Sequence, residues 1–281
     1  MALDQIDVDK AEEKNMSFLD HIEELRWHIV RSVIAILLGA IVCFIFGTFI
    51  FDEIIFGPVN KDFWTYRQIC SLSHLIYDSD KLCFRDLDFK TQNISLSGQL
   101  IQHLVVAIIG GIIMAFPIIL YEIWRFVRPA LQDTERKKTT GIVLVSSFLF
   151  FVGVLFGYFG LTPLSVNFLF NYSVSSKIVN NVTLESYISF VTMMTLATGL
   201  VFELPLMIYF LARLGLVTPA LLRKYRKHSL IVTLVLAAVI TPPDVASQVL
   251  MSIPIYILYE IGILVADRVE KGKNTINIIN D

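Results

Sequence analysis

The chain has 281 residues, of which 55% are hydrophobic and only 17% are charged. Its mean hydropathy is +0.67, which excludes an ordinary soluble domain and predicts a protein that spans a membrane. The formal net charge is −2, so any charged surface must come from the local placement of charges rather than from their total.

The first apolar run follows a polar beginning. Residues 1–16 are acidic and polar, and we expect a disordered tail there without a cleavable signal. The next stretch, FLDHIEELRWHIVRS, predicts an amphipathic helix on the inner membrane surface that turns into a first span at Ser32–Phe51. Its apolar stripe consists of Phe18, Ile22, Leu25 and Ile29. Glu24 lies on the polar face, where the pattern alone favours a solvated carboxylate.

A loop of about residues 52–98 follows the first span and would lie outside. A structureless loop of this length is uncommon in a compact protein, so we expect short helices in it, with Pro58 in a structural role. Cys70 and Cys83 both fall in this loop, but their spacing leaves open whether they form a disulfide, because it does not give their Cα separation. Cys43 lies in the first span and is predicted to be a small packing residue.

The second and third apolar segments are Leu104–Tyr121 and Gly141–Leu161. Pro117 falls within the second span, where neighbouring helices can compensate for the missing hydrogen bond, and Pro129 is expected to help end that helix. Glu135 would lie in the first turn of the third helix, where the helix dipole alone explains a carboxylate.

The fourth apolar segment, Tyr187–Ala212, contains a single charge, Glu203. A carboxylate inside a span costs on the order of 2.5–3.5 kcal/mol on insertion scales, so few such residues are without a role. We expect Glu203 to be a polar contact for a partner helix or a proton site. The alternative is a protonated glutamate that is hydrogen-bonded to a neighbouring span.

Two further segments, Ser229–Thr241 and Val245–Ala266, are separated by a Pro-Pro-Asp corner. Asp244 is predicted to cap the sixth helix, and Gln248 in its first turns needs a partner or water. Glu260, farther along this segment, is near enough to the boundary to extend toward water. The first of the two segments is short, so the pair requires a thinned bilayer or a protein cover. Residues 17–266 thus predict an all-α domain of six transmembrane helices, followed by a cytoplasmic tail at 267–281.

The orientation follows from Lys and Arg, which concentrate on the inner side of bacterial membranes. With the N-terminus inside, 17 of the 23 Lys and Arg residues fall in inner segments. Both termini are therefore predicted to be cytoplasmic. The six residues that remain outside are Lys61, Arg67, Lys81, Arg85, Lys90 and Lys177.

Several motifs that carry chemistry are missing from the sequence. It contains no GxxxxGK[ST] nucleotide loop, no HExxH, no GxSxG and no Cys/His ligand set. We therefore expect no enzymatic activity, no cofactor, no metal and no nucleic-acid partner. A proton-coupled transporter of small solutes stays open, with Glu203 as its proton site, although we find no pair of internal repeats.

Four stretches in this order, each at the end of a span, resemble the TatC family, the multispanning subunit of the twin-arginine protein translocase. They are His21-Ile22-Glu23-Glu24-Leu25-Arg26, Pro117 to Arg136, Phe202-Glu203-Leu204-Pro205, and Thr241-Pro242-Pro243-Asp244 with Gln248. The resemblance runs from about Phe18 to Ala266. The outer loop looks longer than is usual in the family and carries the two cysteines, which puts the shape of the outer mouth in doubt.

The resemblance implies a glove-like, concave six-helix bundle in the bacterial cytoplasmic membrane. It implies an oligomeric complex with TatA-like or TatB-like single-span partners that exports folded precursors and is driven by the proton-motive force. Glu24 and Glu135 would bind the two arginines of the signal peptide, and Glu203 would be the polar point on the concave face. The last two helices would dock the partner's span. A scaffold without peptide recognition is the remaining alternative.

Overall fold

The computed structural model describes residues 18–77, 83, 91–127, 139–175, 177, 181–241 and 245–280. Helices dominate these ranges, and the predicted all-α membrane fold is confirmed. The elements are α2 (Phe18–Ile45), α3 (Gly47–Phe49), the π-helix η1 (Ile50–Ile55), the 3-10 helix η2 (Gly57–Val59), α4 (Trp64–Tyr77), β1 (Thr91–Gln92), α5 (Gly98–Val127), α7 (Thr139–Leu155), the π-helix η5 (Phe156–Leu161), α8 (Thr162–Asn171), β2 (Val182–Thr183), α9 (Leu184–Val201), α10 (Leu204–Arg213), α11 (Pro219–Lys224), α12 (Arg226–Ile240) and α13 (Val245–Asn280).

Five helical segments of the described chain are long and apolar enough to cross a membrane. They are Glu23–Ile45, Gly98–Val127, Gly141–Asn171, Leu184–Arg213 and Ser247–Gly272. The remaining predicted span corresponds to α12, whose 15 residues reach only about 22 Å at 1.5 Å per residue. The expected short fifth helix is therefore present, and the count of six spans requires the thinned or covered bilayer that the sequence predicted.

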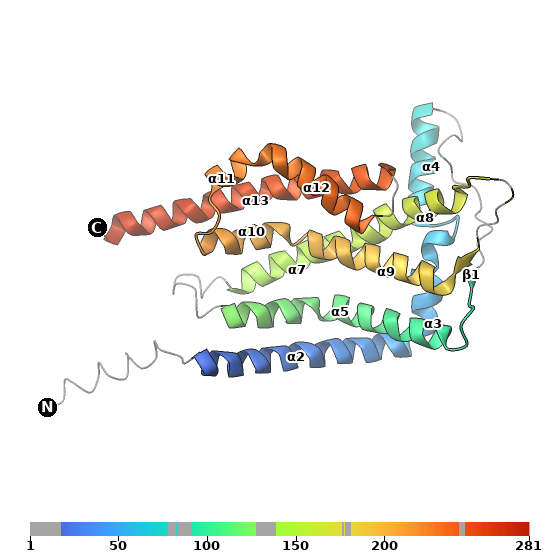
Figure 1. Ribbon diagram of the computed structural model, residues 1–281, viewed down its shortest axis with the longest axis horizontal. Helices are drawn as coiled ribbons and strands as arrows, with labels where there is room; N and C mark the ends of the chain where they lie inside the picture. Colours follow the sequence, from blue (N-terminus) through green and yellow to red (C-terminus); the bar gives the residue numbers. More distant parts are fainter. Residues whose placement is uncertain are drawn as a thin grey trace.

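Most long helices lie along the long axis of the molecule, and α4 stands at one end of it (Figure 1). The opposite end is where α2 begins and where α5, α10 and α13 finish, and we call it the terminal end (Figure 1). The end that carries α4 and the two short strands is the loop end. The strands pair in parallel, Thr91 with Val182 and Gln92 with Thr183, and so join the two loops on that side.

Glycines bring α2 and α5 into close contact. A Cβ added at Gly111 of α5 would lie 2.6 Å from both the backbone nitrogen of Ala40 and the backbone oxygen of Ile36. Such an approach is available only to a residue without a side chain. Gly39 of α2 meets Gly111 from the other side. Because the backbones are held together here, the first turns of α2 lie beside the last turns of α5 at the terminal end.

Three helix boundaries differ from the prediction. The first span was expected to end at Phe51, but α2 ends at Ile45, and α3 and η1 follow it as separate helical segments in which Ile55 is buried against Val106 and Tyr187. The third was expected to end at Leu161 and continues through α8. The fourth is not one helix, since a turn separates α9 from α10 just before Pro205, which lacks the N–H that would extend α9.

Buried proline contacts and a disulfide order the loop end. Pro58 lies within η2, and its carbonyl accepts a hydrogen bond from the Tyr66 hydroxyl at 2.8 Å. Cys70 of α4 is joined to Cys83 by a disulfide, with a Cα–Cα distance of 4.4 Å. The short helix predicted for this loop is thus present as α4, and the pairing that the sequence left open is made in the structure.

Candidate functional site

The terminal end holds a buried polar contact between α2 and α5. Nδ1 of His28 lies 2.5 Å from Oε2 of Glu122, and the two residues are only 5% and 6% exposed. Arg31 extends from α2 to the same carboxylate oxygen, with Nη1 at 3.5 Å. A buried carboxylate requires hydrogen-bonding or charged partners, and Glu122 has two.

Glu24 lies one turn before His28 on α2. Its Oε1 is 3.9 Å from Nε2 of His28, which is within range of an ion pair but too long for a hydrogen bond. Its Oε2 is shielded and has no hydrogen-bond partner among the described residues. The side chain as a whole is 37% exposed, so a donor from outside the chain can approach its exposed part, whereas Oε2 itself is shielded. We call Glu24, His28, Arg31 and Glu122 the α2–α5 cluster.

Three predicted site residues, Pro129, Glu135 and Asp244, lie outside the described residues. Their assigned roles, helix end, peptide contact and helix cap, therefore stay predictions. In the sequence, Glu135 belongs to the segment that joins the end of α5 to the start of α7. Pro117 lies inside α5, which continues past it to Val127.

Glu203 lies at the break between α9 and α10 and is only 8% exposed. The Ser146 hydroxyl of α7 donates a hydrogen bond to its Oε2. The other oxygen, Oε1, is buried without a hydrogen-bond partner in the described part of the chain. A buried carboxylate with one acceptor still open can accept a further donor, which is the behaviour expected of an intramembrane contact point.

Ser146, the hydrogen-bond donor to Glu203, lines a groove of about 600 Å³. It lies between α7, α10 and α13, and its lining includes Ser146, Pro205, Leu206, Tyr209 and Val265. The lining is mostly apolar, so the groove suits apolar side chains of a neighbouring helix, with Ser146 and Glu203 as the adjacent polar pair.

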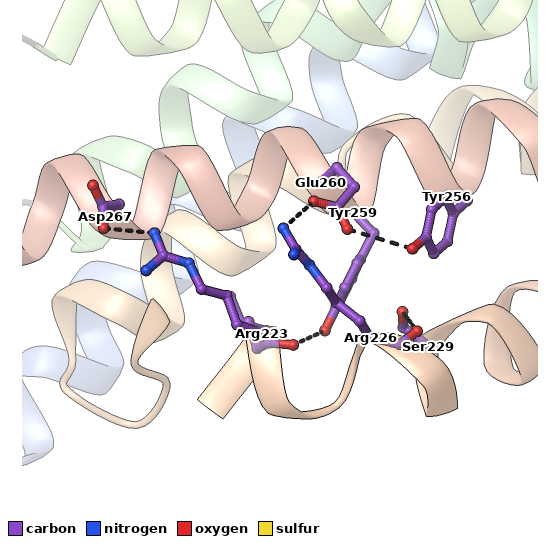
Figure 2. A network of polar contacts seen from close by, with 8 residues as sticks. Arg223, Arg226, Ser229, Tyr256, Tyr259, Glu260 and Asp267 are labelled. Atoms are coloured by element: carbon purple, nitrogen blue, oxygen red, sulfur yellow. Dashed lines mark hydrogen bonds and ion pairs between the residues drawn. The ribbon is translucent and has the colours of Figure 1, made fainter. Parts of the chain in front are cut away.

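A second set of polar contacts at the terminal end joins α11 and α12 to α13 (Figure 2). Nη2 of Arg226 lies 2.7 Å from Oε2 of Glu260, and Nη2 of Arg223 lies 2.9 Å from Oδ1 of Asp267. Lys271 pairs with the other oxygen of Asp267 at 2.8 Å. These five residues, Arg223, Arg226, Glu260, Asp267 and Lys271, form what we call the α11–α13 network. Tyr259 adds a hydrogen bond to the Leu222 carbonyl at 2.8 Å.

Gln248 also has a structural partner. Its side-chain amide donates a hydrogen bond to the backbone carbonyl of Leu234 at 3.2 Å, which ties the start of α13 to α12. The predicted need for a partner is met within the chain. A second, external partner for Gln248 is not needed to explain its position in the span.

One cluster in the described residues has the composition of a metal site. The candidate ligand atoms of Cys70, His74 and Cys83 lie within 4.8 Å of one another. The two sulfurs are joined in the disulfide, however, and a metal binds thiolates rather than a disulfide. In this structure the cluster is therefore a disulfide with His74 beside it, at the loop end.

Neither Glu122 nor His28 was predicted from the sequence as a site residue. A signal was present, since Glu122 is a lone carboxylate in the apolar run FPIILYEIWRF near the end of the second span. The criterion that singled out Glu203, a charge inside an apolar run, also applies to Glu122.

Comparisons with known proteins agree with this geometry. The family model described as "Sec-independent protein translocase protein (TatC)" matches residues 20–254. A relative of that name from Blattabacterium sp. subsp. Periplaneta americana is 40% identical over 94% of this chain and all of its own length. One from Aquifex aeolicus is 32% identical over 93% of this chain and 99% of its own.

Solved structures give the same result. A crystal structure described as "Twin Arginine Translocase Receptor- TatC" superposes with a TM-score of 0.64 at 30% identity, over 89% of this chain and 99% of that one. A second, of the same receptor in DDM, gives 0.67 at 32% identity, over 88% of this chain and 99% of that one. At this identity and coverage, the similarity extends beyond the general fold.

Proposed function

The chain belongs to the TatC family of Sec-independent protein translocase proteins, and on this premise we propose that it binds the twin-arginine signal peptides of folded precursors. The family supplies a component of a protein translocase, not an enzyme. The peptide contacts, the partners and the membrane orientation are our proposal.

The environment of the Glu24 carboxylate is the observation that carries this proposal. Its Oε2 is shielded and without a partner among the described residues, while part of the side chain is open to the surroundings. A guanidinium group presents a planar fork of donors that matches a carboxylate, and the bond to a charged acceptor is stronger than one between neutral groups. Glu24 would receive one arginine, and Glu135 the other.

The position of Glu24 on α2 suits a signal peptide. Glu24 lies at the beginning of the first candidate span, Glu23–Ile45. A peptide whose arginines stay at this level can place its following apolar segment in the lipid beside the bundle. The distribution of Lys and Arg supports a cytoplasmic location for the terminal end, because 17 of 23 such residues fall in the segments assigned to that side.

Partners would bind at a different place. We assign the groove between α7, α10 and α13, with Glu203 beside it, to the span of a TatA-like or TatB-like protein. The apolar lining supports a helix as the occupant, and the open acceptor of Glu203 supports a polar residue within it. Export of folded proteins by the resulting oligomer would be driven by the proton-motive force across the bacterial cytoplasmic membrane.

Co-isolation tests the proposal directly. The full chain, purified in mild detergent, should retain a precursor whose signal peptide carries two arginines, and should retain much less of the same precursor with two lysines, which keep the charge but not the fork. Equal retention of both precursors would contradict arginine recognition. Solute flux by the chain alone in liposomes would instead favour the proton-coupled transporter.

A further inference from the structure

A second groove lies in the half of the bundle nearer the loop end. It has a volume of about 460 Å³, and its lining comes from the end of α2, from η1, α5, the end of α7, η5 and α9. Three large apolar side chains of the lining, Ile54, Met114 and Leu155, are exposed, whereas Val106 and Val191 belong to the buried core. The groove therefore opens from the core to the outside of the spans, which is the surface that lipid covers in a membrane.

The polar groups of this lining already have partners. The hydroxyls of Thr192 and Thr195 each donate to a backbone carbonyl of α9 at 2.7 Å. The Cys43 thiol donates to the Met114 sulfur at 3.7 Å, and the Tyr158 hydroxyl donates to a backbone carbonyl of η1 at 2.6 Å. Among the described residues, no lining side chain has a buried oxygen or nitrogen without a partner. Buried water needs two to four polar partners, so an apolar molecule is the expected occupant.

The volume of the groove indicates how large this occupant is. Protein interiors contain few voids larger than a water molecule. An apolar cavity of about 150 Å³ already binds benzene, and this groove is about three times as large. In a bilayer the neighbouring molecules are acyl chains, which are flexible and apolar. A chain that enters the groove gains dispersion contacts on several sides.

An aromatic cluster adjoins the groove on the side of the loop end. Phe159 of η5 lines the groove, and Trp64 of α4 packs edge-on against it, with ring centroids 5.9 Å apart. Tryptophan is enriched at the level of the lipid headgroups, and α4 lies across the direction of the spans at their loop end (Figure 1). Arg67, three residues after Trp64 on the same face of α4, is exposed and can pair with a phosphate.

We propose that this groove is a binding site for one acyl chain of a phospholipid from the leaflet at the loop end. The chain lies between η1 and α5 on one side and η5 and α9 on the other, and it completes the packing of these segments. The headgroup lies beside Trp64, with its phosphate near Arg67. The site is separate from the α2–α5 cluster and from the groove that we assign to a partner helix.

Helix α5 offers a matched pair of variants. Ile109 lines the groove, whereas its neighbour Ile108 is exposed and is not part of the lining. Ile109→Phe places a ring in the groove, and Ile108→Phe adds the same ring where it meets bulk lipid. Arg67→Gln removes the proposed phosphate partner. Thermal melting in detergent checks that all three variants fold.

The experiment is a titration of the delipidated full chain in detergent with a phospholipid, followed by native mass spectrometry. We expect the wild type and Ile108→Phe to bind one phospholipid per chain with the same affinity. Ile109→Phe should bind about tenfold more weakly, since about two methylenes of the acyl chain lose their contacts in the groove. Arg67→Gln should bind about threefold more weakly, because its partner is partly solvated.

A phospholipid with a photoreactive group at the middle of its acyl chain locates the site in the wild type. It should label the 109–114 segment of α5, and excess unlabelled phospholipid should abolish this label. Labelling of Leu37 and Leu38, which are exposed on α2, should not saturate. This measurement decides the question by itself if Ile109→Phe does not fold.

Three results would overturn the proposal. They are a wild type that binds no phospholipid, equal binding by Ile109→Phe and Ile108→Phe, and a label at 109–114 that excess phospholipid does not reduce. Crosslinks from a single-span partner to this segment, in place of the lipid label, would assign the groove to a protein helix instead. None of these measurements uses the signal peptide, so their failure leaves the receptor proposal unchanged.

Discussion

The α2–α5 cluster and the α11–α13 network both gather carboxylates at the terminal end, but among the described residues only the first leaves one without a close cation. In the network, Glu260 and Asp267 each have an arginine within 3 Å (Figure 2). Lys271 pairs with Asp267 as a third cation. In the cluster, Arg31 and His28 both contact Glu122, and within the described part of the chain the nearest cationic partner of Glu24 is the His28 ring at 3.9 Å.

This difference separates two uses of the same side chain. The carboxylates of the network are already paired and hold α13 to α11 and α12, so an external arginine would have to displace an internal one. Glu24 has an oxygen without a hydrogen-bond partner among the described residues, and it lies one turn from the buried His28–Glu122 contact that fixes its helix. A receptor for arginine is therefore expected where charge pairing is incomplete, not wherever acidic residues occur.

The largest expected difference between the two regions is in the free energy of unfolding, because Glu122 is buried and the network is partly exposed. Glu122→Ala should lower the free energy of unfolding by about 3–5 kcal/mol, because removal of one partner leaves His28 without its counterpart in a buried site. Denaturant titration in detergent measures this, with Glu122→Gln as the variant that retains an acceptor for Nδ1. A loss below about 1 kcal/mol for Glu122→Ala would mean that the contact does not stabilise the α2–α5 interface.

The second-largest difference between the two regions is expected in how substitutions there change peptide affinity. Glu24→Gln is expected to weaken twin-arginine peptide binding by roughly ten- to a hundredfold, since a hydrogen bond to a charged group contributes about 1.5–3 kcal/mol. The same change in the network, Glu260→Gln, should alter affinity by less than about twofold, because Glu260 is already paired with Arg226. Fluorescence anisotropy with a labelled peptide measures both. Equal losses would show that the peptide responds to overall charge.

Glu203, at the break between α9 and α10, is a third carboxylate to compare with Glu24 and Glu260. Glu203→Ala should leave peptide affinity within about twofold, since Glu203 bonds to Ser146 of α7, beside the groove that we assign to a partner helix, and shares no described partner with Glu24. It should reduce site-specific crosslinks between α10 and a TatA-like or TatB-like span, with Ser146→Ala giving a smaller reduction. Unchanged crosslinks and export would leave Glu203 as a tolerated buried acid.

The smallest effect is expected in the network itself. Arg226→Ala should lower the free energy of unfolding by less than about 1 kcal/mol, because the Arg226 and Glu260 side chains are 47% and 33% exposed and partly solvated pairs contribute little. Denaturant titration under the conditions used for Glu122→Ala gives the direct comparison. A loss as large as that of Glu122→Ala would remove the distinction between the regions.

The sequence predicted the spans well, because long apolar runs depend on composition and length alone. Helix ends were harder to predict. Ile55 is held in η1 by packing against α5 and α9, and such contacts between distant segments are not visible in local periodicity. The break before Pro205 could have been predicted from the missing N–H, since proline at the start of a helix is common.

The candidate site was predicted in part. Glu24 was identified through a family motif, and its position beside His28 follows from their four-residue spacing on α2. The contact between His28 and Glu122 depends on how α2 packs against α5, which the close approach at Gly111 determines. Glu122 was not predicted, although it is a lone carboxylate in the apolar run FPIILYEIWRF. A lone carboxylate in an apolar run close to a span end therefore merits the same attention as one at its middle.

A double-mutant cycle tests the central claim most directly. Glu24→Gln is combined with lysine substitution of each peptide arginine in turn, and Glu260→Gln serves as the control on the same peptide set. We predict a coupling energy of about 1.5–3 kcal/mol between Glu24 and one of the arginines, and close to zero for Glu260. Coupling near zero between Glu24 and both arginines would contradict the claim that this partly unpaired carboxylate receives the signal peptide.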